Sequence, residues 1–194
     1  MTAVAQTPPT PASPWAVTTR VIVYAAIGAA LYALFNWISF AIAIPGANNV
    51  SVRPHYGLLT FFGFAFGPIV GFLTDFVGNV VGDQLTGWGA FTSWPWSVAN
   101  GLAGLIAGLF PIWMASRMNS VGSKALTAAV AGVVATIIGF LFIFVELVTQ
   151  SEMGFNAILT EEYIPTVIAN SIAAAIVTPI LVLAWEPISA QMGR

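Results

Sequence analysis

Four apolar runs, each long enough to cross a lipid bilayer, constrain this chain more than any other feature. A membrane-spanning helix needs about 20 apolar residues. Charged residues make up only 6% of the chain, against about 25% in a soluble domain, so a soluble fold could not cover its surface with charge. We therefore expect an all-α, polytopic membrane helical bundle. The four runs are Thr18–Ile44, Ser97–Ser116, Ala125–Val145 and Ile164–Trp185.

The first 16 residues have a different composition, with four prolines and no apolar run. This composition is typical of a disordered segment, and it lacks the charged start and short apolar stretch of a secretory signal. We expect a disordered cytoplasmic tail over residues 1–16, followed by a single transmembrane domain over residues 17–190.

The number of helices depends on the stretch Tyr56–Gln84. It reads either as one tilted span or as two short helices broken at Gly67-Pro68. Each half, of about 14 residues, would reach only about 21 Å. The excess of basic residues in cytoplasmic loops does not choose between five and six helices. Each arrangement places four of the five basic residues inside.

Both arrangements agree on which links face outside. The basic link Arg117–Lys124 is expected in the cytoplasm, and the loops Leu85–Pro95 and Gln150–Tyr163 are expected outside. Glu161 and Glu162 lie in the second of these loops.

Polar side chains gather at one depth, in the outer half of the bundle. Polar groups at membrane depth are costly and usually face the bundle interior or a water-filled cavity. Asp75, Asn79 and Asp83 share one helix face because they are four residues apart. The set indicates either hydrogen bonds between helices or a ligand cavity open to the outside. The residues expected to bind ligand from within the spans are Asn36, Asn79, Asp83, Asn100, Glu146 and Asn170.

The outer loop TGWGAFTSWPW adds Trp88, Trp94 and Trp96 to these candidates. Tryptophan residues can form a belt at the headgroup level, or they can cover a planar ligand. Arg53 is the one basic residue outside in the six-helix arrangement, where it could pair with lipid phosphate, the acidic loop or a ligand anion. The single His55 and the absence of cysteine predict no metal site, and we expect no cofactor.

The first apolar run carries a row of small residues at four-residue spacing, Ala25, Ala29 and Ala33. Such rows let another helix approach closely. The row predicts either packing within this chain or docking onto a separate membrane protein.

These patterns resemble the S component, the substrate-binding membrane subunit of an energy-coupling factor (ECF) vitamin transporter, and most closely the riboflavin-type S components. The segments that carry the resemblance are VSVRP, LLTFFGFAFGPIVGFLTDFVGNVVGDQL and NGLAGLIAGLF. The resemblance implies six helices with both termini inside, a multi-pass location in the plasma membrane, and docking through the alanine row.

It also implies the partners: a vitamin-like substrate, a membrane coupling subunit and two cytoplasmic ATPases. The chain has no G-x-x-x-x-G-K-[ST] loop of its own for ATP. Riboflavin, a thiamine or pyrimidine precursor, and a corrinoid all remain open as substrates.

Other functions compete with this reading. A stand-alone ion-coupled carrier or channel could use Asp75 and Asp83 as a relay, although the sequence shows no inverted repeat. An intramembrane protease with paired glutamates, as in Glu161-Glu162, would need several histidines, and this chain has one. A purely structural subunit is a further alternative. We expect no enzyme activity, and the net charge of −2 predicts no nucleic-acid partner.

Overall fold

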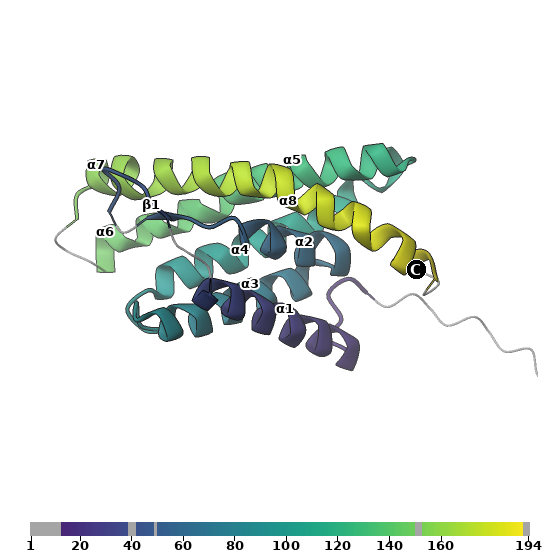
Figure 1. The fold of residues 1–194 in the computed structure, drawn as a ribbon, viewed down its shortest axis with the longest axis horizontal. Helices are drawn as coiled ribbons and strands as arrows, with labels where there is room; N and C mark the ends of the chain where they lie inside the picture. The colour runs from purple at the N-terminus through teal and green to yellow at the C-terminus, as the bar shows by residue number, and fades with distance from the viewer. Residues whose placement is uncertain (1–12, 39–41, 49, 150–152, 192–194) are drawn as a thin grey trace, which may run out of the picture.

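The protein is a bundle of α-helices that run roughly along one long axis (Figure 1). The structure is a computed structural model that describes residues 13–38, 42–48, 50–149 and 153–191. The elements in chain order are α1 (Thr19–Ile38), β1 (Ile42–Ala43), β2 (Ser51–Val52), α2 (Tyr56–Phe66), α3 (Pro68–Thr86), α4 (Trp94–Trp113), η1 (Ala115–Arg117), α5 (Val121–Gly139), η2 (Phe140–Val145), α6 (Glu146–Thr149), α7 (Phe155–Ala157), η3 (Ile158–Tyr163) and α8 (Ile164–Gln191).

The all-α expectation is confirmed, and so are the four long apolar spans. Among the described residues, four helical stretches are long and apolar enough to cross a membrane, and α2 is a shorter apolar helix. The four stretches are Thr19–Ile38, Trp94–Trp113, Val121–Thr149 and Phe155–Gln191.

Two predicted boundaries were wrong. The first span ends at Ile38 and not at Ile44, because the following segment forms β1, which pairs antiparallel with β2 through Ile42–Val52 and Ala43–Ser51. At the other end of the chain, the expected loop Gln150–Tyr163 is helical from Phe155 onward and continues into α8. Most of the expected N-terminal tail, residues 1–12, lies outside the described residues.

The chain breaks between α2 and α3 at Gly67, so Tyr56–Gln84 forms two helices. Gly67 has φ +101°, a left-handed backbone conformation that side chains disfavour. Pro68 starts α3, where its fixed φ suits a first helical position and its missing N–H costs nothing.

Close backbone approach joins α2 and α3 to α4. A Cβ added at Gly63 or Gly71 would lie against the Gly104 carbonyl oxygen, and one added at Gly108 would meet the Gly67-Pro68 backbone. Contacts this close require a glycine on at least one side, because a Cβ would not fit. They bury the α2–α3 turn against α4.

The alanine row of α1 is buried inside this chain, which favours the first of the two predicted roles, packing within the chain, over docking onto a partner. Ala25, Ala29 and Ala33 are 4–6% exposed. The Thr74 hydroxyl of α3 donates to the Ala25 carbonyl at 3.4 Å, and Gly78 of α3 leaves room for Ala29. A partner cannot reach side chains that α3 already covers.

Both described ends of the chain lie at the same end of the bundle. Figure 1 shows the first described residues and the C-terminus together at one end, and α6, α7 and β1 at the other. At the end near the termini, α5 starts with a capping box between Ser120 and Ser123, and Lys124 forms a salt bridge with Glu186 of α8.

Candidate ligand-binding cavity

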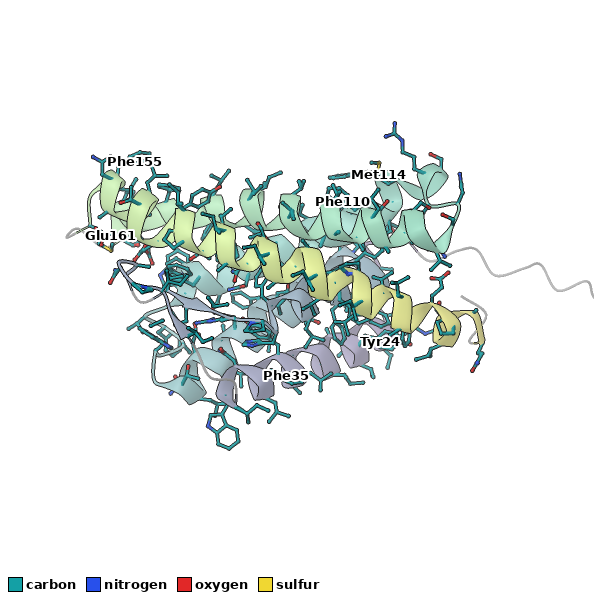
Figure 2. All side chains as sticks on the ribbon, turned by 45° about the horizontal axis from the view of Figure 1, so that its top comes forward. Tyr24, Phe35, Phe110, Met114, Phe155 and Glu161 are labelled. Atoms are coloured by element: carbon teal, nitrogen blue, oxygen red, sulfur yellow. The ribbon has the colours of Figure 1, made fainter. Side chains whose placement is uncertain are left out.

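A cavity of about 310 Å³ opens at the end of the bundle opposite the termini. This is the end that Phe155 and Glu161 mark in Figure 2, whereas Met114 lies at the other end. The cavity walls come from α1, α2, α3, α4, η2, α6, η3 and α8 and from the β2 segment. The lining residues are Tyr32, Asn48, Val50, Ser51, Arg53, Tyr56, Asp83, Trp88, Thr92, Ser93, Trp96, Asn100, Phe140, Glu146, Glu162, Thr166 and Asn170.

One wall holds Arg53 and Asp83 in a hydrogen-bonded network. Arg53 Nη1 donates to Asn79 Oδ1 at 3.4 Å, and Asn79 Nδ2 donates to Asp83 Oδ2 at 2.8 Å. The Ser93 hydroxyl also donates to Asp83 Oδ2, at 2.7 Å. The positive charge of Arg53 is therefore balanced by a carboxylate close to it.

His55 lies next to this network but adds no positive charge. Its ring centroid is 5.1 Å from that of Tyr32. Burial, with a smaller contribution from the Arg53 charge, lowers the pKa of His55 to about 4, so the imidazole is neutral near pH 7. Arg53 is consequently the one cation on the described lining of the cavity.

A second wall holds two glutamates. The Trp96 indole N–H donates to Glu146 Oε1 at 3.1 Å, and Asn48 Nδ2 donates to Glu162 Oε1 at 2.9 Å. The Asn48 backbone N–H also donates to the Glu161 carbonyl at 2.9 Å. These bonds fasten the segment after β1 onto η3, and they hold both carboxyl groups at the cavity.

Aromatic rings form the surface between the two walls. Trp96 meets Phe140 edge-on at 6.1 Å between ring centroids, and Phe140 lies 6.0 Å from Tyr56. The Thr136 hydroxyl donates to the Tyr56 hydroxyl oxygen at 3.1 Å. The cavity therefore offers flat apolar surface together with polar groups, as small-molecule sites do.

Of the ten residues predicted from the sequence to bind ligand, seven line this cavity and three lie elsewhere. The seven are Arg53, Asp83, Trp88, Trp96, Asn100, Glu146 and Asn170. Asn36 packs against Gly82 in the α1–α3 contact, Asn79 stands behind Arg53 and Asp83, and the Trp94 ring meets Phe142 edge-on at 6.0 Å. Direct ligand contact stays a prediction for all ten residues. Asn36, Asn79 and Trp94 do not line the cavity, so their positions disfavour such contact.

Sequence reasoning missed several lining residues, among them Tyr32, Asn48, Tyr56, Phe140, Glu162 and Thr166. Glu162 is 4% exposed whereas its neighbour Glu161 is exposed. The two adjacent charges could have drawn attention to this pair. Because the segment was predicted to be a loop, nothing indicated that one of the two glutamates would be buried. The helical geometry of η3 makes that distinction.

Comparison with known proteins places this chain in a transport family. The family model for the S component of ECF-type riboflavin transporters matches residues 16–186. The chain belongs to this family. It is accordingly a multi-pass protein of the plasma membrane, and S components are transporter subunits and not a class of enzymes. Among the described residues, no group of three or more His, Asp or Glu side chains is arranged to hold a metal ion.

Individual relatives of this S component are bacterial UPF0397 proteins. One from Aliivibrio fischeri (strain MJ11) is 40% identical over 101 residues, which cover 52% of this chain and 53% of the relative. In that match the chain spans about half the length of the curated relative. One from Streptococcus gordonii is 29% identical over 179 residues, covering 91% of this chain and 92% of the relative. No solved structure matches.

Proposed function

We propose that this S component captures a small vitamin-like molecule from outside the cell in the cavity between Arg53 and Glu162. An ECF module, made of a membrane coupling subunit and two cytoplasmic ATPases, then drives its release inside. Family membership supports the transport role. The observation that carries the binding role is the cavity itself, which has a volume of about 310 Å³, within the range of small-molecule sites.

Buried polar atoms on the cavity wall support the binding of a polar ligand. Asp83 Oδ1, Glu162 Oε2 and Thr166 Oγ1 are buried without a hydrogen-bond partner among the described residues, and all three side chains line the cavity. Buried polar atoms in folded proteins are nearly always hydrogen-bonded. A polar ligand in the cavity would supply these partners.

The proposal includes six crossings with both termini in the cytoplasm. It is supported by the separate helices α2 and α3, and by the position of both described ends on one side of the bundle (Figure 1). The cavity then opens outward, and Lys124 lies on the cytoplasmic side, as the excess of basic residues there favours.

Single cysteines test this orientation, since the natural chain has none. Phe91 is 93% exposed in the outer loop, and Ser120 is exposed at the opposite end. A membrane-impermeant maleimide added to intact cells should label Phe91→Cys and not Ser120→Cys. Permeabilised cells should show labelling of both. The reverse pattern in intact cells would overturn the orientation.

Asn100→Leu tests the cavity. Asn100 is 3% exposed, lines the cavity and donates to the Trp96 carbonyl at 2.8 Å. Losing one buried hydrogen bond between Asn100 and the ligand would cost about 1–3 kcal/mol. The molecule that co-purifies with the wild type should therefore bind to the variant about tenfold or more weakly. Mass spectrometry identifies that molecule, and titration measures its affinity.

Asn156→Leu is the control for this experiment, because Asn156 is exposed on α7 at the same end of the bundle. Its affinity should equal that of the wild type. Equal affinity of Asn100→Leu and the wild type would remove the cavity from the binding role.

A stand-alone ion-coupled carrier is the second candidate. Asp75 is fully buried in α3, and both of its carboxyl oxygens lack a hydrogen-bond partner among the described residues, as in an ion or proton relay. Measuring substrate uptake into liposomes that contain only this purified chain distinguishes the carrier from the S component. A carrier would accumulate substrate alone, whereas an S component needs the ATPase module.

A further inference from the structure

The charges around the cavity are distributed unevenly between its two walls. Four lining residues carry a formal charge: Arg53, Asp83, Glu146 and Glu162. Arg53 and Asp83 interact electrostatically on one wall and balance each other. Glu146 and Glu162 stand together on the other wall, and no lysine or arginine lines the cavity beside them in the described part of the chain.

The two glutamates are close to each other. Their carboxyl groups interact electrostatically. The Trp96 indole and the Asn48 amide, which donate hydrogen bonds to them, are both neutral. Two carboxylates this close repel each other strongly when both are ionised. A bound proton or a cation between them would remove that repulsion.

One carboxylate oxygen of the pair has no hydrogen-bond donor among the described residues. Glu162 is 4% exposed, its Oε1 is occupied by Asn48, and its Oε2 is buried without a hydrogen-bond partner among the described residues. Leaving a charged oxygen without a donor is costly. A donor supplied by the ligand is the simplest way to satisfy it.

The surface beside the pair is aromatic. Trp96 donates to Glu146 and also stands edge-on to Phe140, which in turn lies next to Tyr56. Aromatic faces attract cations and provide flat contact for planar rings. Carboxylates together with aromatic rings are the chemistry that recognises a cationic nitrogen on a ring system.

We infer that the ligand is a planar heteroaromatic molecule that presents a positively charged or protonated amino nitrogen to Glu146 and Glu162. This inference rests on the proposed function and makes it more specific. A neutral flavin supplies no such charge, so we expect the cavity to bind a cationic ring more tightly than riboflavin, the ligand in the family's description.

Two probes and one pair of variants test the inference on the full chain in detergent. Thiamine carries a quaternary ring nitrogen and an amino group, and riboflavin is neutral. Wild-type protein should bind thiamine at least tenfold more tightly than riboflavin in calorimetric titration. Glu162→Gln keeps the shape and removes the charge, so it should weaken thiamine binding about tenfold or more and leave riboflavin binding unchanged.

Glu161→Gln is the matched control, since Glu161 is the exposed neighbour of Glu162 in η3. It should bind both probes as the wild type does. Tighter binding of riboflavin than of thiamine, unaffected by Glu162→Gln, would overturn the inference and leave the proposed function standing.

If neither probe binds, mass spectrometry of the molecule released from purified protein decides. A released molecule with a basic or quaternary nitrogen on an aromatic ring would support the inference, and one without it would overturn it. A protein that binds neither probe and releases no small molecule would count against the proposed function itself.

Discussion

Gly104→Leu should leave no correctly folded protein in the membrane. Gly104 lies in α4 where α3 comes closest, and a Cβ there would run into the Asp75 carboxyl group and the Gly71 carbonyl oxygen. The backbone cannot move aside as a flexible side chain could. Van der Waals contact is the main attraction between helices in lipid, so separating α3 from α4 removes the packing on which the bundle depends.

Overpacking a core typically costs about 1–3 kcal/mol and sometimes more, and Gly104 is enclosed on two sides by backbone and a carboxyl group. Size-exclusion chromatography in detergent should show aggregate in place of the monodisperse wild-type peak. Gly122→Leu is the control, because Gly122 is exposed at the start of α5 and meets only the Ser120 hydroxyl at 4.0 Å. A monodisperse Gly104→Leu protein with the wild-type melting temperature would contradict the prediction.

Ala30→Trp should abolish ATP-driven uptake and leave ligand binding in detergent at the wild-type level. On α1, the buried alanines face α3, whereas Ala26 and Ala30 are exposed on a neighbouring face of the helix. These two are four residues apart, so they offer a coupling subunit the close approach that small residues allow. A tryptophan at position 30 would block that approach without touching the cavity.

Ala29→Trp provides the matched comparison one residue away. Ala29 is 6% exposed and faces Gly78 of α3, so this variant should lose folding, binding and uptake together. Uptake by cells expressing the ECF module, and co-purification of the coupling subunit, measure the difference. Wild-type uptake by Ala30→Trp would show that this face of α1 is not the docking surface.

Several features could be predicted from residues alone because they depend on local chemistry. The four long spans follow from apolar length. The sequence marked Gly67-Pro68 as one possible break but left a single tilted span open, and the structure has two helices there. Asp83, Asn100 and other lining residues within the spans were predicted because polar groups inside a bilayer usually face the bundle interior or a water-filled cavity.

The faces of α1 could not be predicted in the same way. Alanine, leucine and isoleucine are about equally compatible with lipid and with a helix neighbour, so hydrophobic pattern does not distinguish the buried side of a membrane helix from its outer side. The row Ala25, Ala29 and Ala33 and the row Ala26 and Ala30 look alike in sequence. Only the glycines of α3, which accept the first row, separate them.

The second wall of the cavity was likewise decided by tertiary structure. Glu161 and Glu162 are chemically identical, and the rotation of η3 turns the second inward while the first stays exposed. Asn48, about 110 residues earlier in the chain, completes that wall by bonding to Glu162. The sequence by itself determined a helical membrane bundle with polar groups gathered toward one of its ends. The rotation of each helix, and with it the pairing of Glu146 with Glu162, came from packing between distant segments, because lipid does not favour one apolar face of a helix over another.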